Sequence, residues 1–215
     1  MNIGVLGAGN VGRTLGSGFL KLDHQVMLGS RDPRKKELVD WVQQNSGARA
    51  GTLEETARFG EMILIAVEGR AAAAALELAG KTNFAGKTVI DATNPIAAGP
   101  PVDGILPFFT GPGESLGERI QAQIPDAHVV KAFNSVGAAL MVNPHLEQGT
   151  PTMFLCGNNA DAKAQVAEII RQFAWEPYDC GSIVASRAIE PLCMLWVSRG
   201  MQHNEWHHAF KLLTR

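Results

Sequence analysis

The chain has 215 residues, of which 46% are hydrophobic and 19% are charged. Its 19 Lys and Arg nearly balance 21 Asp and Glu, so the formal net charge of −2 offers no basic surplus for nucleic acid. No apolar run reaches the roughly 18 residues that a bilayer-spanning helix needs. Three cysteines without metal-ligand spacing indicate reduced thiols. We therefore expect a cytoplasmic protein with one large core and neither a nucleic-acid nor a membrane partner.

Short apolar segments alternate with helical patterns through the first half of the chain, which is typical of a parallel α/β sheet. A first helix is expected at residues 11–22. Asp32 before Pro33 predicts the N-cap and first residue of a second helix, which ends near residue 45. The strands of this half are expected at residues 2–6, 25–28, 62–67 and 88–91.

The second half repeats the alternation more loosely. Residues 99–113 contain four prolines and predict an ordered loop over a cleft or a flexible lid. A long helical pattern runs from residue 185 to 213, interrupted by Pro191 and Gly200. Between these segments, helices are expected at residues 115–123 and 161–173, and strands at residues 128–132 and 152–156.

Gly7, Gly9 and Gly12 form the pattern G-x-G-x-x-G between the first strand and the first helix. In this context the first glycine permits a tight turn and the second lets a pyrophosphate approach the backbone. The third packs the helix against the strand. Backbone N–H groups at the helix start, including those of Asn10 and Val11, would hold the phosphates. The pattern predicts a dinucleotide-binding site.

These features define the expected fold class. It is α/β, a Rossmann-type doubly wound and mostly parallel sheet with a small C-terminal helical segment. We expect the nucleotide-binding domain at residues 1–180 and the helical segment at residues 181–215. Since no linker, low-complexity tract or repeat separates them, both should belong to one compact unit.

The segment after the second strand indicates which dinucleotide binds. An NAD site usually places an acidic residue there for the ribose hydroxyls, whereas an NADP site uses small polar and basic groups. We interpret Asp32 as the helix cap, which leaves the Ser30 hydroxyl and the Arg31 guanidinium for a 2′-phosphate. Arg34 or Lys35 would add charge. The alternative is a solvated basic helix start, but basic residues suit a helix N-terminus poorly unless an anion binds there. The sequence predicts NADP(H).

Two further segments should border the cofactor. Parallel sheets bind ligands at the carboxyl ends of their strands. Ala66 and Val67 end the strand at residues 62–67, and Asn94 and Pro95 follow the strand at residues 88–91. We therefore add these four residues to the predicted cofactor site.

Several motifs occur in a recognisable order: Ile3–Gly12, Gly29–Pro33, Asp91–Pro95, Val130–Asn134, Pro151–Phe154 with Cys156–Gly157, Ser186–Arg187 and Glu190–Leu192. Together they resemble the NADPH-dependent deazaflavin-coenzyme reductase family, whose fold also forms the cytosolic part of the STEAP metalloreductases. The resemblance covers nearly the whole chain and implies NADP and hydride transfer to a flavin-like ring. Archaeal members carry His where this chain has Asn134, and Ser and Thr where it has Pro191 and Cys193. The cofactor half of the resemblance therefore transfers better than the acceptor half.

The acceptor side offers two candidate residues. Hydride transfer between nicotinamide and a flavin-like ring needs stacked rings and little acid–base help, so positioning supplies the rate. Asn134 would hold a carboxamide or ring carbonyl, and Arg187 an anionic group of the acceptor. The alternatives are a turn residue at Asn134 and an ion pair between Arg187 and Glu190. Catalytic residues stay unassigned.

Other reactive residue types give no site. His203 and His207 share a helix face and His208 is adjacent, but a third ligand with suitable spacing is missing, so we expect no metal. Cys180 and Cys193 lack a local base or basic cluster and are not expected to act as nucleophiles. Residues 71–75 are interpreted as helix without a role in a site.

The C-terminal segment predicts a homodimer. Charged residues are few, and the segment is too small to bury all of its large apolar side chains by itself. These side chains are Leu192, Leu195, Trp196, Phe210 and Leu213.

The leading functional hypothesis is an NADPH-dependent oxidoreductase that exchanges hydride between NADP(H) and a flavin or deazaflavin-like small molecule. Two alternatives stay open. One is a non-catalytic NADP(H)-binding sensor or regulatory subunit, favoured by the lack of a proton-transfer group. The other is a reductase of a small imine or keto substrate, for which Lys131 is the candidate near the nicotinamide.

Overall fold

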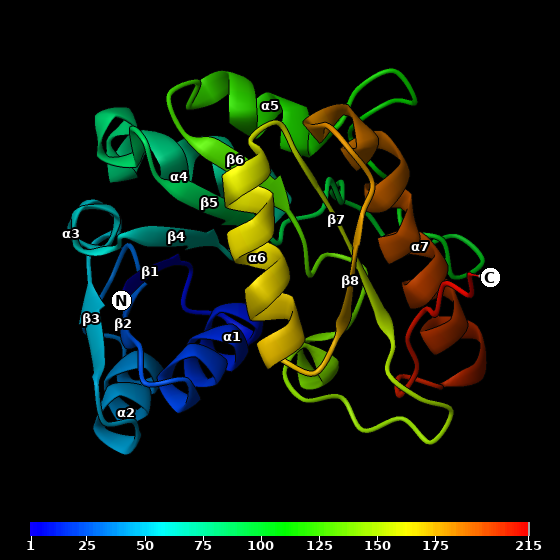
Figure 1. The fold of residues 1–215 in the computed structure, drawn as a ribbon, viewed down its shortest axis with the longest axis horizontal. Helices are drawn as coiled ribbons and strands as arrows, with labels where there is room; N and C mark the ends of the chain where they lie inside the picture. Colours follow the sequence, from blue (N-terminus) through cyan, green and yellow to red (C-terminus); the bar gives the residue numbers. More distant parts are fainter. Residues whose placement is uncertain (215) are drawn as a thin grey trace.

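The computed structural model describes residues 1–214, which contain an eight-stranded sheet in the order β3-β2-β1-β4-β5-β6-β7-β8 (Figure 1). Strands β1 to β6 are parallel, β7 is antiparallel to β6, and β8 is parallel to β7. The sheet confirms the expected doubly wound, mostly parallel architecture. The strands are β1 (Asn2–Leu6), β2 (Gln25–Gly29), β3 (Ala48–Gly51), β4 (Met62–Ile65), β5 (Thr88–Asp91), β6 (His128–Lys131), β7 (Thr152–Gly157) and β8 (Glu176–Asp179).

Helices cover both faces of the sheet. Side chains of α1, α2 and α6 pack on one face, and side chains of α3, α4 and α5 pack on the other. Successive strand residues alternate between the two faces, so β4 is buried along its whole length. None of the helices in residues 1–214 combines the length and apolar character that a bilayer-spanning segment needs. The helices are α1 (Asn10–Lys21), α2 (Lys36–Gln44), α3 (Leu53–Phe59), α4 (Ala72–Ala79), α5 (Leu116–Gln123), α6 (Ala160–Gln172) and α7 (Ser186–His203).

The second helix does not begin where the sequence predicted. α2 starts at Lys36, and the Asp32 carboxylate accepts the backbone N–H of Arg34 at 3.1 Å. The Ser30 hydroxyl in turn accepts the backbone N–H of Asp32 at 3.2 Å. Asp32 and Pro33 therefore belong to a side-chain-supported turn before the helix, and the assignment of Asp32 as N-cap was wrong.

Two elements between β2 and β4 were not identified from the sequence. β3 consists of Ala48, Arg49, Ala50 and Gly51, which lack the apolar run that marks a buried strand. This composition fits its place at the edge of the sheet. α3 did carry a signal, because Thr52 and Glu55 form a complete capping box in which each side chain accepts the other's backbone N–H.

The C-terminal segment is helical only as far as His203. α7 continues through Pro191 without a break and ends at His203. Asn204 is its C-cap and has a left-handed φ of 53°. The chain then returns along β7, where the Thr152 N–H donates to the Phe210 carbonyl at 2.8 Å. The Trp206 ring packs closely on Gly200. A side chain would not fit there, since a Cβ at Gly200 would lie 2.3 Å from the ring. The expected helical pattern beyond residue 203 was therefore wrong.

The proline-rich segment is an ordered hairpin attached to α7. Antiparallel bridges join Ile96 to Phe108 and Val102 to Ile105. Its tip is held by Gln202, whose side-chain amide donates to the Asp103 carbonyl at 3.1 Å. The sequence left open an ordered loop over a cleft or a flexible lid; the structure shows a hairpin that packs against α7, and residues 99–113 do not line the cleft described below.

The predicted dimer would bury exposed apolar side chains of α7 and the tail. Trp196 is buried in the core and Phe210 packs against it, but Leu195 is 58% exposed and Leu213 is 84% exposed. We expect the protein to sediment as a homodimer at micromolar concentration and Leu195→Asp to shift it toward monomer, because a charge would be buried in the interface.

A matched control lies at the other end of the molecule. Val39 is 37% exposed on α2, and this helix lies far from α7 in Figure 1, so Val39→Asp should leave the dimer intact. A monomeric wild type would contradict the predicted dimer.

Candidate functional site

The segment that joins β1 to α1 requires glycine at two positions. Gly7 has a φ of +119°, and a Cβ there would lie 2.5 Å from the Ala66 carbonyl oxygen. At Gly12 a Cβ would lie 2.1 Å from the Gly7 carbonyl oxygen. Both positions therefore require glycine, one for its backbone angle and both for close contact with backbone atoms.

The start of α1 is suited to an anion. Its N-cap is Gly9, which provides no side-chain cap, and the first turn contains no acidic residue. A Cβ at Gly9 would meet no atom within 4 Å, so the backbone there is open to a ligand. Helix N-terminal N–H groups and the helix dipole favour phosphate at such a site. These features fit the pyrophosphate of a dinucleotide.

A cleft of about 900 Å³ opens at the carboxyl ends of β1, β2, β4 and β5. This volume is typical of sites for cofactors and other small ligands. The structure brings most of the predicted cofactor residues together in its lining, but not Gly12, Arg34 or Pro95. The predicted residues that line it are Gly7, Gly9, Asn10, Val11, Ser30, Arg31, Lys35, Ala66, Val67 and Asn94.

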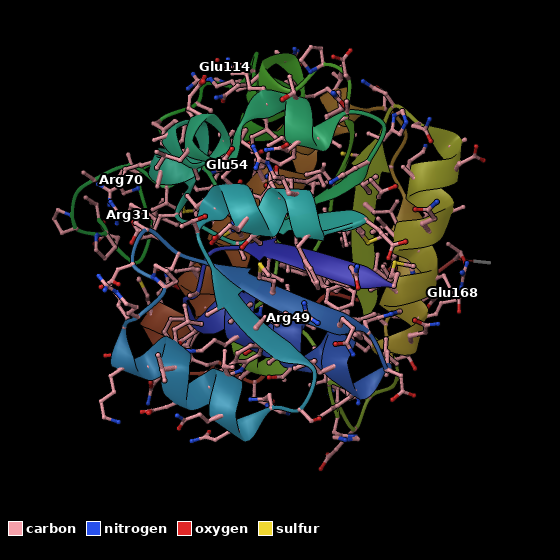
Figure 2. The ribbon with its side chains drawn as sticks, turned by 90° about the vertical axis from the view of Figure 1, so that its left-hand side faces the viewer. Arg31, Arg49, Glu54, Arg70, Glu114 and Glu168 are labelled. Carbon is pink, nitrogen blue, oxygen red and sulfur yellow. The ribbon has the colours of Figure 1, made fainter. Side chains whose placement is uncertain are left out.

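One end of the cleft is cationic. Ser30, Arg31 and Lys35 line it beside the end of β2, whereas the carboxylate of Asp32 is used in its own turn. A hydroxyl with two cations and no lining carboxylate at this position fits a 2′-phosphate better than free ribose hydroxyls. Figure 2 shows Arg31 at the same side of the molecule as Arg70, which also lines the cleft and pairs with Glu68 at 3.2 Å.

Sequence reasoning missed the wall formed by the start of α4. Ala71, Ala74 and Ala75 line the cleft together with Leu78, so the interpretation of residues 71–75 as having no place in a site was wrong. The signal was the position of this segment after β4, because the turn that follows a parallel strand borders the ligand site. Small side chains here leave room for a bound group.

The other end of the cleft is lined by Thr93, Asn94 and Ile96. The Asn94 amide donates to the backbone carbonyl of Asn134 at 2.8 Å, and the Asn134 amide donates to the Asn94 side-chain oxygen at 3.0 Å. Asn134 also donates to the Ile189 carbonyl at 3.1 Å and is 3% exposed. It lies behind Asn94 and not in the lining, so it supports the cleft wall from within.

Arg187 lies outside the lining of the cleft. Its guanidinium donates twice to the Glu118 carboxylate, at 2.7 and 2.8 Å. These hydrogen bonds hold the pKa of Glu118 below its usual value. The alternative of an ion pair with Glu190 was wrong, because Glu190 pairs with Lys131 instead.

Lys131 is fully buried beneath the cleft wall. Its ammonium contacts Asp91 at 2.8 Å, Glu190 at 2.9 Å and the Thr93 carbonyl at 2.7 Å. Burial lowers the pKa of Lys131, but the two carboxylates outweigh it and the net shift is upward. Its three N–H donors are all used, so it is not placed to protonate a substrate.

The remaining candidate residues take structural places. Burial raises the pKa of Cys156 and of Cys193 to about 11, so both thiols stay protonated at neutral pH. The His208 ring stacks on Trp196 with centroids 4.9 Å apart. His207 contacts the carbonyl of His145, and His203 is the last residue of α7. Within residues 1–214, no cluster of three or more His, Cys, Asp and Glu residues is arranged to hold a metal.

Fold and cleft together define a Rossmann-type, NADP(H)-binding oxidoreductase. The family described as NADP oxidoreductase, coenzyme F420-dependent, matches residues 2–95. A solved structure from Arthrobacter sp. FB24, described as a candidate F420-dependent NADP reductase, is 33% identical with a TM-score of 0.93, and each chain is covered over 100% of its length. The protein belongs to this F420-dependent NADP oxidoreductase family, which confirms the resemblance found in the sequence.

More distant relatives share parts of this likeness. Metalloreductase STEAP3 of Rattus norvegicus is 28% identical over 191 residues, which are 88% of this chain and 36% of that protein. Metalloreductase STEAP2 of Homo sapiens is 28% identical over 208 residues, which are 93% of this chain and 38% of that protein. The chain thus spans little more than a third of these relatives. An imine reductase from Aspergillus terreus, 16% identical with a TM-score of 0.68 over 94% of this chain and 63% of that one, shares the fold.

The cationic end of the cleft predicts a preference for NADPH. We expect NADPH to bind at least about tenfold more tightly than NADH, about 1.4 kcal/mol, and Arg31→Ala to remove most of this preference with little effect on NADH. Titration of both cofactors by fluorescence or calorimetry measures the two dissociation constants and hence this preference. Arg34→Ala is the matched control, because Arg34 does not line the cleft. Equal affinities of the wild type for both cofactors would contradict the 2′-phosphate site.

Proposed function

We propose that this oxidoreductase transfers hydride from NADPH to a flavin or deazaflavin-like acceptor. The observation that carries the proposal is the makeup of the cleft end formed by Thr93, Asn94 and Ile96, where the amide of Asn94 and the apolar side chain of Ile96 can orient rings. Hydride transfer between stacked rings needs positioning and little acid–base help. The family description supports it as well, because coenzyme F420 is a deazaflavin.

The sheet order supports the placement of the nicotinamide at this end. A pyrophosphate at the start of α1 lies over β1, and the cationic end beside β2 would take the phosphorylated ribose. β4 and β5 lie on the opposite side of β1 from β2. The nicotinamide half of the cofactor would therefore extend over the ends of β4 and β5, toward Asn94.

The protein's own groups would act mainly by holding and orienting. NADPH would supply the hydride with both electrons, and the single proton that completes the reduction of the acceptor would come from water. The glycine turn and the first N–H groups of α1 would bind the pyrophosphate, while Ser30 and Arg31 would bind the 2′-phosphate. Asn94, held by two hydrogen bonds with Asn134, would fix the nicotinamide carboxamide. The apolar walls exclude water from the reacting rings.

The alternative of imine or keto-acid reduction needs a proton donor, and the residue expected to provide it is not free to do so. Lys131 was the candidate, and its ammonium is committed to Asp91, Glu190 and the Thr93 carbonyl. The likeness to imine reductases is one of fold, at 16% identity. A flavin-like acceptor does not need such a donor, which is why we favour it.

Stopped-flow oxidation of NADPH tests the proposal directly. The acceptors are FMN, FAD, riboflavin and a deazaflavin, each at several concentrations under anaerobic conditions. We expect saturable NADPH oxidation with at least one of them. Stoichiometric NADPH binding without turnover on any acceptor would contradict the proposal and favour the sensor alternative.

Asn134 and Arg187 should affect the reaction in different ways. Asn134→Ala removes the support of Asn94, so the rate of the hydride step should fall about tenfold or more while NADPH still binds. Arg187 would meet only an acceptor tail that reaches beyond the cleft, so Arg187→Ala should raise KM for a phosphate-bearing acceptor and leave the rate at saturation nearly unchanged. Riboflavin, which lacks the phosphate, is the matched control. Unchanged kinetics in both variants would place the acceptor elsewhere.

A further inference from the structure

Three charged side chains meet in the interior at the carboxyl edge of the sheet. Asp91 ends β5, Lys131 ends β6, and Glu190 lies in the second turn of α7. Asp91 and Lys131 have no exposed surface and Glu190 is 2% exposed. The ammonium is 2.8 Å from the Asp91 carboxylate and 2.9 Å from the Glu190 carboxylate. We call these residues the buried triad.

Hydrogen-bond donors surround both carboxylates of the triad. The Glu190 oxygens receive the backbone N–H groups of Leu116 and Gly117, at 3.0 and 2.9 Å, besides the ammonium. All of these partners can only donate, so a protonated carboxyl would find no acceptor. Asp91 receives the ammonium and the N–H and hydroxyl of Thr93. Two carboxylates against one ammonium leave one excess negative charge.

The triad is joined to the cleft wall through one residue. Thr93 lines the cleft, and its N–H and hydroxyl donate to the same Asp91 oxygen at 2.9 and 2.6 Å. Its carbonyl accepts from the Lys131 ammonium at 2.7 Å. The excess charge therefore lies one residue behind the end of the cleft that is assigned above to the nicotinamide.

We propose that the buried triad holds a negative charge behind the nicotinamide and thereby favours the oxidised form of the bound cofactor, which makes NADPH a stronger hydride donor. This inference rests on the proposed function for the placement of the ring. It assigns to Asp91, Lys131 and Glu190 an electrostatic role in addition to their structural one.

The charge difference between the two cofactor forms carries the argument. Oxidised nicotinamide has a positively charged ring, whereas the reduced ring is neutral. A nearby fixed negative charge therefore stabilises NADP⁺ and not NADPH, and burial keeps water and salt from screening it. The N-terminus of α5, which donates to Glu190, offsets part of the charge, about half of one unit. The phosphate-binding cations act on both forms alike.

The dissociation constants of NADP⁺ and NADPH measure this effect without any acceptor. In the wild type we expect NADP⁺ to bind more tightly than NADPH. In Glu190→Gln, which removes one full unit of negative charge while the N-terminus of α5 stays in place, binding of NADP⁺ should weaken relative to that of NADPH by roughly 15-fold, as Coulomb's law gives for a unit charge about 10 Å away at an effective dielectric constant of about 20. Asp91→Asn also removes one negative charge, but from β5 instead of α7. It should change the ratio of the NADP⁺ and NADPH dissociation constants in the same direction.

Two controls separate charge from structure. Lys131→Met combined with Glu190→Gln leaves Asp91 as the one remaining charge of the triad and should return the ratio toward that of the wild type. Glu168→Gln removes an exposed charge from α6, on the opposite side of the molecule from Arg31 and Arg70 in Figure 2, and should leave the ratio unchanged.

The outcomes distinguish this inference from the proposed function. A purely structural role would weaken both cofactor forms by the same factor in the Glu190 and Asp91 variants, which would overturn the inference. If neither variant folds, the wild-type ratio decides, and tighter binding of NADPH than of NADP⁺ overturns it. A wild type that binds neither form would instead refute the assignment of the cleft.

Discussion

A single ammonium group without exposed surface joins the parts of this protein that surround the cofactor cleft. Lys131 ends β6 and reaches β5 through Asp91, the cleft wall through the Thr93 carbonyl, and α7 through Glu190. A buried charge is costly unless it is paired and fully hydrogen-bonded, so separation of any one of these elements would leave a charge without its partner. Glu190 extends this constraint to α5, because its carboxylate also accepts the first two backbone N–H groups of that helix. The position of the C-terminal helix is thus coupled to the edge of the sheet where the cofactor site lies.

The cofactor side of the cleft could be predicted well because its constraints are local in sequence. Gly7 and Gly12 are required by contacts of the turn with backbone atoms, and the glycine spacing records that requirement directly. Strand β5 has the predicted bounds because its two central residues, Val89 and Ile90, are apolar and buried. Ser30 and Arg31 follow a strand end, where a parallel sheet binds its ligand.

The acceptor side could not be predicted as well because its contacts join residues far apart in the chain. Asn134 reaches Asn94 and Ile189, and nothing in the sequence near Asn134 shows that it turns into the interior. The same holds for the pairing of Arg187 with Glu118 and not with Glu190, three residues away. Asp32 before Pro33 matched the pattern of a helix start, and its carboxylate does accept the Arg34 N–H, but the turn does not continue as a helix and α2 begins only at Lys36.

The order of the strands also bears on how the chain is made. Within residues 1–214, β1 precedes the other strands along the chain and lies in the interior of the sheet, paired with β2 on one edge and with β4 on the other. At translation rates of about 5–20 residues per second, β1 and β2 wait roughly 2–7 s for β4 to follow. During this interval β1 presents an unpaired edge with apolar side chains on both faces, including Ile3, Val5 and Leu6. Nascent chains that contain β1 and β2 but not β4 therefore expose an unpaired apolar strand edge, where we expect aggregation or chaperone binding to occur.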